Sequence, residues 1–177
     1  GHLYPGRGIE IILQVAERVP AAWFVIIGGR EEDITACTRQ ARARGLQNVD
    51  FLGFLPNAEL PRYLVAADAL LMPYQHRVTS PSMPDTSSWM SPMKMFEYMA
   101  FRKPIVSTDI PAARQFSEII SIAYSRGEFA DSISQILRND NRQRIQRGFE
   151  IARQNSWDIK VEEISQVIHA YLYSKVK

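Results

Sequence analysis

The sequence has little of the chemistry that disulfides, metal centres and membrane spans require. Cys37 is the only cysteine among 177 residues, so no internal disulfide can form. The histidines His2, His76 and His169 lie far apart, and no close group of His, Cys and carboxylate residues has metal-ligand spacing. The longest uninterrupted apolar run, 21–27, is far shorter than the roughly 20 residues that a spanning helix needs.

A strong net charge is also absent. The chain carries 21 Lys and Arg against 19 Asp and Glu, a net charge of +2, which is too small to indicate a nucleic-acid-binding protein. Hydrophobic residues make up 46%, enough for a sizeable core, which excludes a disordered chain. The mild basicity is compatible with a small anionic ligand.

The length indicates one domain, and we expect residues 1–177 to form it. The sequence opens on Gly1-His2-Leu3, without methionine or a signal-peptide pattern, and turns at once at Pro5-Gly6. We therefore expect a fragment of a longer protein, with Gly1 as a cloning remnant. The single cysteine fits a reducing compartment, so we expect a cytoplasmic location.

Short apolar runs alternate with amphipathic stretches along the chain. Helical spacing or helix-start signals predict helices at 7–19, 31–44, 57–67, 92–102, 111–117, 127–138, 140–154 and 157–173. Apolar runs predict strands at 23–27, 49–52, 69–72, 104–107 and 119–124. This order predicts an α/β fold, a Rossmann-like parallel sheet with helices on both faces.

Residues 75–91 break the alternation. The segment is rich in Ser, Thr and Pro and has no periodicity. A stretch of this length inside a compact domain is typical of a lid or binding loop, or of disorder.

Glycines and polar residues follow the predicted strands. They are Gly28-Gly29, Gly53, Pro73 and Thr108. Parallel sheets bind ligands at the carboxyl ends of their strands, so these residues are expected to line one binding rim.

The helix predicted after the long segment begins with an anion-binding pattern. Ser91 is a good N-cap and Pro92 suits the first helical position. The free amides of Met93 and Lys94 then point out of the positive helix end, where a phosphate group can bind. Glu97 lies far enough along to reach a sugar hydroxyl. The alternative is a capped core helix with a Lys94–Glu97 pair at i,i+3.

Seven motifs follow one another in a distinctive order. They are GHLYPGRG (1–8), IIGG (26–29), VDFLGFL (49–55), AADALLMP (66–73), FEYMA (96–100), PIVSTD (104–109) and SW (156–157). Together they resemble the C-terminal, donor-nucleotide-binding domain of GT-B fold, retaining glycosyltransferases of the group 1 (family 4) type. The resemblance covers nearly the whole chain, and its strength lies in the ordered set.

The resemblance implies a diphosphate site in the first motif. An Arg and a Lys there contact the donor diphosphate in the family, and here those positions hold His2 and Arg7. Arg7 keeps the charge and can bind phosphate in a bidentate way. His2 keeps a donor but is charged only part of the time near neutral pH, and a turn residue is its alternative reading.

The resemblance also implies where the nucleobase lies. Family members hold it near the loop that matches Gly53-Phe54-Leu55, largely through the main chain. Phe54 as an ordinary core aromatic is the alternative. Gly28 and Gly29 are expected to leave room for the donor.

The sequence departs from the family in the Glu-x7-Glu motif. Glu97 matches the second glutamate, which resembles a ribose-hydroxyl ligand, but the first position holds Trp89. The first glutamate contacts the donor sugar in the family, so its absence bears on sugar recognition. Asp85 is a candidate substitute from the loop, or otherwise a turn residue. Arg102 replaces a usual glycine, and the sequence gives no reason for it.

The implied activity is transfer of a sugar from a nucleotide diphosphate sugar to a glycan, lipid or other acceptor, of the hexosyltransferase type. Arg7 and the helix-start amides would stabilise the leaving diphosphate, with no metal or cofactor. The N-terminal acceptor domain is missing, so this fragment alone is expected to be inactive. Membrane contact is expected to be peripheral at most, at the inner face.

Other functions remain open. One is a non-catalytic nucleotide-sugar-binding module, suggested by Trp89 and the missing half, and another is a sugar-nucleotide epimerase of the same fold. A receiver domain lacks its paired acidic residues after the first strand. A nicotinamide-binding domain lacks its third glycine, because Gly6-Arg7-Gly8 leads straight into Ile9.

In the related fold a first strand lies near the middle of the sheet, and only residues 1–3 represent it here. We expect compensation for its loss: either the two neighbouring strands pair with each other, or another chain fills the gap.

Overall fold

The computed structural model describes residues 1–3, 6–75 and 93–174. Nearly all of the Ser/Pro-rich segment lies outside these residues, and so do Asp85, Trp89, Ser91 and Pro92. The predictions for those positions therefore concern residues outside the described part of the chain.

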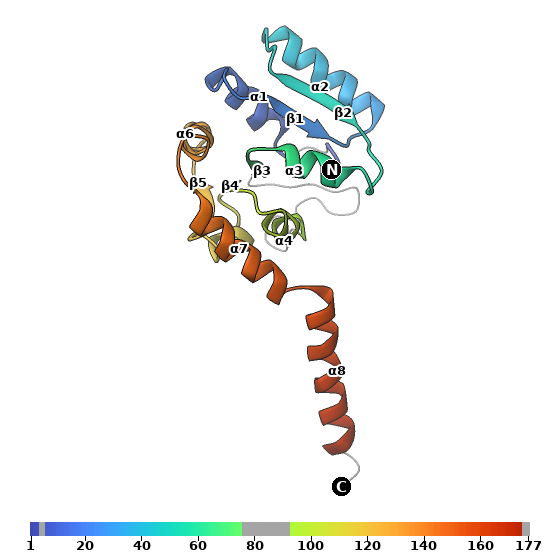
Figure 1. Ribbon diagram of the computed structural model, residues 1–177. Coiled ribbons are helices and arrows are strands. Elements are labelled where there is room, and N and C mark those ends of the chain that lie inside the picture. The colour runs from blue at the N-terminus through green and yellow to red at the C-terminus, as the bar shows by residue number, and fades with distance from the viewer. Residues whose placement is uncertain (4–5, 76–92, 175–177) are drawn as a thin grey trace.

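Helices and strands alternate through the first two thirds of the described chain, and helices alone complete it (Figure 1). The helices are α1 (Ile9–Arg18), α2 (Glu31–Ala43), α3 (Leu60–Ala66), α4 (Met93–Ala100), α5 (Pro111–Arg114), α6 (Arg126–Ile136), α7 (Arg142–Gln154) and α8 (Trp157–Ser174). The strands are β1 (Phe24–Ile27), β2 (Val49–Gly53), β3 (Leu70–Met72), β4 (Ile105–Thr108) and β5 (Ile120–Ala123).

Each predicted element is present, with shifted ends. The largest shifts are in α5, which ends at Arg114 and not at Ser117, and in α3, which begins at Leu60 and not at Asn57. Pro61 occupies its first turn. Proline lacks an amide hydrogen and has a helical φ, so it favours a helix start at its own position.

All strand pairs are parallel, as predicted, but the strands form two sheets. β1 pairs with β2, and β4 lies between β3 and β5. Within the described residues β1 and β3 are not paired with each other. Of the two compensations expected for the missing strand, the first, in which its neighbours pair with each other, is therefore wrong for this structure, and the second, in which another chain fills the gap, stays a prediction.

One apolar core nevertheless joins the two sheets. Val15 of α1, Phe24 of β1, Val106 of β4 and Phe129 of α6 belong to one buried cluster. Val15, Val106 and Phe129 are completely inaccessible to solvent. Helix α1 thus shares one buried core with strands of both sheets.

A second core lies under α4. Met95 and Met99 are its buried face and pack with Ile105 and Ile120 of the three-stranded sheet. Helix α7 contacts α4 as well, and its Ala152 belongs to the same buried cluster. The four-residue spacing of the two methionines fixes which side of α4 faces outward.

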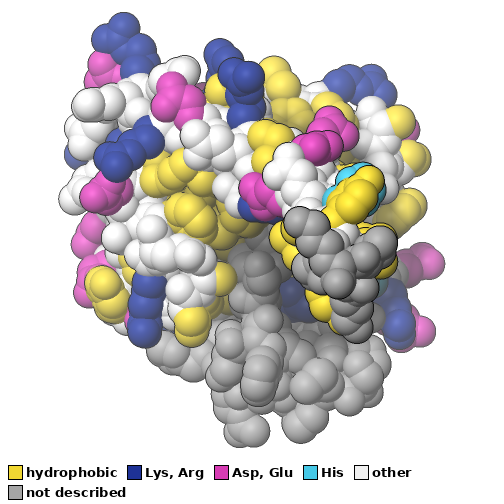
Figure 2. All heavy atoms as spheres, turned by 90° about the horizontal axis from the view of Figure 1, so that it is seen from below, with side chains coloured by type: hydrophobic (Ala, Val, Ile, Leu, Met, Phe, Trp, Pro, Cys, Tyr) yellow, Lys and Arg dark blue, Asp and Glu magenta, His cyan; other side chains and the backbone are white. Residues whose placement is uncertain are grey.

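Helix α8 projects away from the body of the molecule (Figure 1). Its large apolar residues are exposed, among them Trp157, Val161, Val167 and Tyr173. Seen from below, Lys and Arg side chains are interspersed with Asp and Glu over the surface (Figure 2), as the small net charge implies.

Candidate functional site

Gly28 and Gly53 join the carboxyl ends of β1 and β2. The Gly28 amide donates a hydrogen bond of 2.6 Å to the Gly53 carbonyl. Gly28 has a φ of 109° and Gly53 a φ of 73°, a region that side-chain-bearing residues rarely adopt. A bulge between Ile26 and Ile27 brings Ile27 opposite Gly53. The two glycines therefore lie together at one rim, as the sequence predicted.

Residues 1–3 run directly over this rim. The Gly1 amino group donates to the Ile27 carbonyl. A Cβ atom at Gly28 would collide with the Gly1 backbone, and one at Gly29 would lie 2.5 Å from Leu3 Cδ1. In this structure the space beside both glycines is thus taken by the chain itself.

The turn at Gly6–Gly8 places Arg7 between α1 and the end of β3. Gly8, with a φ of 92°, caps α1, and a Cβ atom there would collide with the Pro73 carbonyl oxygen. The Gln75 amide donates to the Gly6 carbonyl at 2.9 Å. The turn is therefore packed closely against the chain that leaves β3.

Arg7 itself is only partly accessible. Its Cζ lies 5.8 Å from the centre of the Tyr74 ring, a cation–π arrangement. Its Nε is buried and has no hydrogen-bond partner among the described residues. Buried donors are almost always paired, so this nitrogen has an unused capacity to bind an acceptor.

Lys94 brings a second side-chain cation to the same place, from the first turn of α4. Its ammonium end lies against Gly1. Lys94 is exposed as a whole residue, but its charged end is partly buried. This burial is the main cause that lowers the pKa of Lys94, and the charge of Arg7 is the second. The surroundings of the ammonium group matter more than the accessible stem, because the charge resides at the tip. Glu97 acts in the opposite direction and raises this pKa.

Glu97 lies on the exposed side of α4. No ion pair forms between Lys94 and Glu97, although other i,i+3 pairs, such as Lys160–Glu163, do form in the described chain. The alternative interpretation made α4 a capped core helix with an ion pair between Lys94 and Glu97. That ion pair is not formed. Met93, next to Lys94, is 57% exposed.

Phe54 follows Gly53 and is 78% exposed. Its alternative interpretation as a core aromatic is therefore wrong. Leu55 beside it is half-buried. An aromatic ring that protrudes next to a rim glycine is available to stack on a flat ligand.

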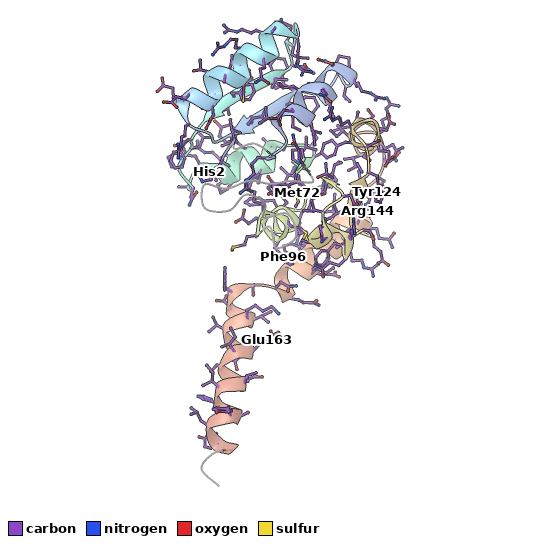
Figure 3. The ribbon with its side chains drawn as sticks, turned by 180° about the vertical axis from the view of Figure 1, so that it is seen from behind. His2, Met72, Phe96, Tyr124, Arg144 and Glu163 are labelled. Atoms are coloured by element: carbon purple, nitrogen blue, oxygen red, sulfur yellow. The ribbon has the colours of Figure 1, made fainter. Side chains whose placement is uncertain are left out.

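His2 is exposed and lies at the edge of the body near α3. Tyr124 and Arg144 lie on the opposite side in the same view, with Met72 of β3 between them (Figure 3). Gly28 is bonded to Gly53, Gly1 lies against both Gly28 and the Lys94 ammonium, and the charge of Arg7 acts on Lys94, so the four predicted site residues Arg7, Lys94, Gly28 and Gly53 lie along one rim.

Two tyrosines at the rim escaped the sequence analysis. Burial, followed by the charges of the neighbouring Tyr74 and Glu97, raises the pKa of Tyr98 to about 12. Burial also raises the pKa of Tyr74, against the charge of Arg7. Thr108 Oγ1 donates to the Tyr74 carbonyl at 2.5 Å and ties the ends of β3 and β4 together. The position of Tyr74 directly after Pro73 was the available signal.

Two further features bear on the chemistry. Among residues 1–3, 6–75 and 93–174, no three His, Cys, Asp or Glu residues lie close enough together to hold a metal ion. In the same ranges no helix combines the length and apolar character needed to cross a membrane.

Comparisons with known proteins identify relatives of this fold. Residues 1–139 match the family model described as "Glycosyl transferases group 1". The sucrose-phosphate synthase from Thermosynechococcus elongatus has a TM-score of 0.78 at 17% identity, over 98% of this chain and 44% of its own. Anabaena Alr3699/HepE in complex with UDP and glucose has a TM-score of 0.73 at 20% identity, over 96% and 47%.

A third similar structure is an alpha,alpha-trehalose-phosphate synthase (UDP-forming) from Burkholderia vietnamiensis, with a TM-score of 0.72 at 13% identity, over 99% and 44% of the two chains. The chain thus spans less than half the length of these three structures. Curated proteins give no match. Identities this low show only that the fold is shared. The family model, in contrast, covers well over half of the sequence and therefore shows the family. The chain is therefore a GT-B-type domain that belongs to the group 1 glycosyltransferases.

Proposed function

We propose that this chain is the donor-binding domain of a retaining glycosyltransferase, which moves a hexosyl group from a nucleotide diphosphate sugar to a glycan, lipid or other acceptor. The observation that carries the proposal is the meeting of Arg7 and Lys94 at the carboxyl-end rim, beside Gly28 and Gly53. In the described chain neither cation forms an ion pair with a carboxylate. An unneutralised basic site at this end of a parallel sheet suits a diphosphate.

The proposed site has three parts. The diphosphate lies against Arg7 and the Met93 and Lys94 amides at the start of α4, with His2 as a further donor. Glu97 accepts hydrogen bonds from the ribose hydroxyls. The base lies over Gly53, Phe54 and Leu55.

A similar structure supports the ligand class. Anabaena Alr3699/HepE is described in complex with UDP and glucose, and its fold aligns with 96% of this chain. The same kind of ligand is compatible with the charge and aromatic character of the rim.

The chemistry follows from where charge develops. As the glycosidic bond to the diphosphate breaks, negative charge grows on the leaving oxygens, and fixed cations such as Arg7 stabilise it. We propose that this stabilisation needs neither a metal ion nor another cofactor. The acceptor belongs to an N-terminal domain outside residues 1–177, so we propose that this chain alone does not catalyse transfer. A cytoplasmic location, with at most peripheral membrane contact, completes the proposal.

One observation favours a second candidate. Trp89 stands where the family's first Glu-x7-Glu glutamate is expected. A non-catalytic nucleotide-sugar-binding module would bind the donor without needing that carboxylate. Binding experiments do not separate the two candidates, but a transfer assay on the longer protein does.

Titration calorimetry with UDP, GDP and ADP tests the proposal. We expect one of the three to bind, and Arg7→Gln to weaken it tenfold or more, since a charge-assisted hydrogen bond contributes about 1.5–3 kcal/mol. Arg62→Gln is the control, because Arg62 is an exposed cation on α3. Absence of heat and of any thermal shift with all three nucleotides would overturn the proposal.

A further inference from the structure

The segment that leaves β3 packs closely against the turn at 6–8. A Cβ atom at the last residue of this turn, Gly8, would collide with the Pro73 carbonyl oxygen. The amide of Gln75 donates a hydrogen bond of 2.9 Å to the carbonyl of the first residue of the turn. Contacts at both ends therefore hold the two short segments together, and their middle residues are brought next to each other.

Those middle residues are Arg7 and Tyr74. Arg7 Cζ lies 5.8 Å from the centre of the Tyr74 ring. Tyr74 is only 8% exposed and belongs to the buried cluster under α4. Its carbonyl accepts a hydrogen bond of 2.5 Å from Thr108 Oγ1 at the end of β4. The guanidinium group of Arg7 thus lies beside an aromatic ring that is itself held in place by the core.

This ring positions Arg7 without neutralising it. In the described chain no carboxylate forms an ion pair with Arg7, and Arg7 Nε is buried without a hydrogen-bond partner. An aromatic face attracts a guanidinium group and occupies none of its N–H donors, whereas a carboxylate would occupy donors and cancel the charge. The charge of Arg7 and a hydrogen bond from it act on the Tyr74 hydroxyl, whose pKa is raised by burial. Most of the guanidinium donors therefore stay available to an anion.

We propose that Tyr74 is a positioning residue for donor binding, because its buried ring holds the Arg7 guanidinium group in the orientation that meets the diphosphate. The proposal rests on the donor-binding function above and deepens it, since it adds a residue that acts without touching the ligand. An arginine side chain loses conformational freedom when it binds phosphate, and a side chain that is already oriented loses less. Tyr74 should therefore change the affinity only while Arg7 is present.

A double-mutant cycle tests this dependence. Calorimetry measures the binding of inorganic pyrophosphate to the wild-type protein, to Tyr74→Leu, to Arg7→Gln and to the variant that carries both changes. We expect Tyr74→Leu to weaken binding about fivefold or more when Arg7 is present, which is the range of a partly desolvated cation–π contact. In the Arg7→Gln background the same change should cause no further loss. A ring that merely supports the fold would lower the affinity by the same factor in both backgrounds.

Three companion variants separate positioning from folding. Tyr74→Phe keeps the ring and should bind pyrophosphate nearly as tightly as the wild type. Tyr74→Met fills much of the same volume without an aromatic face and should repeat the loss that depends on Arg7, so it decides the question if Tyr74→Leu does not fold. Phe129→Leu is the matched control, because Phe129 is a completely buried aromatic residue of α6 in the other core cluster. It should lower the melting temperature and leave pyrophosphate affinity unchanged.

Several outcomes would overturn the inference while leaving the proposed function intact. They are wild-type affinity in a folded Tyr74→Leu or Tyr74→Met variant, an equal loss with and without Arg7, and a loss in Tyr74→Phe as large as that in Tyr74→Leu. A wild-type protein that binds neither pyrophosphate nor UDP, GDP or ADP would overturn both the inference and the proposed function.

Discussion

The guanidinium carbon of Arg102 lies 3.9 Å from the centre of the Phe149 ring. Arg102 follows the end of α4 and has a φ of 54°, the only positive φ of a non-glycine residue in the described chain. Its family counterpart is usually glycine, which adopts this conformation without strain. Stacking on α7 therefore explains how an arginine is tolerated at a glycine position.

Truncating Arg102 should separate the strain from the stacking. Arg102→Ala keeps the left-handed conformation and loses the stacking, so we expect a loss of about 1 kcal/mol in the free energy of unfolding. Arg102→Gly loses the stacking but relieves about 1–2 kcal/mol of backbone strain, so it should be near neutral. Urea unfolding measures both. An Arg102→Gly variant less stable than Arg102→Ala would contradict this account.

Two glycines with positive φ should respond very differently to alanine. Gly45 has a φ of 69° and nothing within 4 Å of an added Cβ, so Gly45→Ala should cost only the backbone strain of about 1–2 kcal/mol. At Gly8 the added atom also meets the Pro73 carbonyl oxygen, so roughly 1–3 kcal/mol more is expected. Thermal and urea unfolding of both variants gives the comparison. Equal losses would mean that the turn at Gly6–Gly8 can move away from β3.

Glu97→Gln should discriminate between ligands. A carboxylate that accepts from ribose hydroxyls matters for UDP and not for pyrophosphate, which has none. We expect a tenfold or greater loss for UDP, from a charge-assisted bond of about 1.5–3 kcal/mol, and little change for pyrophosphate. Glu163→Gln on the projecting helix α8 is the control (Figure 3). Equal losses for both ligands would make Glu97 a structural residue.

Phe54→Ala should weaken nucleotide binding without destabilising the protein. The ring is 78% exposed, so its removal opens no cavity. Stacking of an aromatic on a base contributes about 1–3 kcal/mol, which predicts at least a fivefold loss for UDP and none for pyrophosphate. Tyr124→Ala is the matched control, since Tyr124 is 70% exposed and follows β5, which belongs to the other sheet. An unchanged UDP affinity in Phe54→Ala would place the base elsewhere.

The local structure was available from the sequence because its causes are local. Apolar runs such as 23–27 are strands, and the four-residue spacing of Met95 and Met99 gives α4 its buried face. Glycines after strands placed Gly28 and Gly53 at one rim, since parallel strands end at the same edge. The ordered motifs led to the family for the same reason, because they mark the strand ends and helix starts of this fold.

The tertiary structure decided what depends on residues far apart in the chain. That the Lys94 ammonium reaches Gly1 and the field of Arg7 follows from the packing of α4 and of the turn at 6–8, which no periodicity records. The exposure of Phe54 and the stacking of Arg102 on Phe149 are likewise non-local. So is the separation of β1 from β3, because strand pairing depends on which segments lie side by side and not on the strand sequences alone.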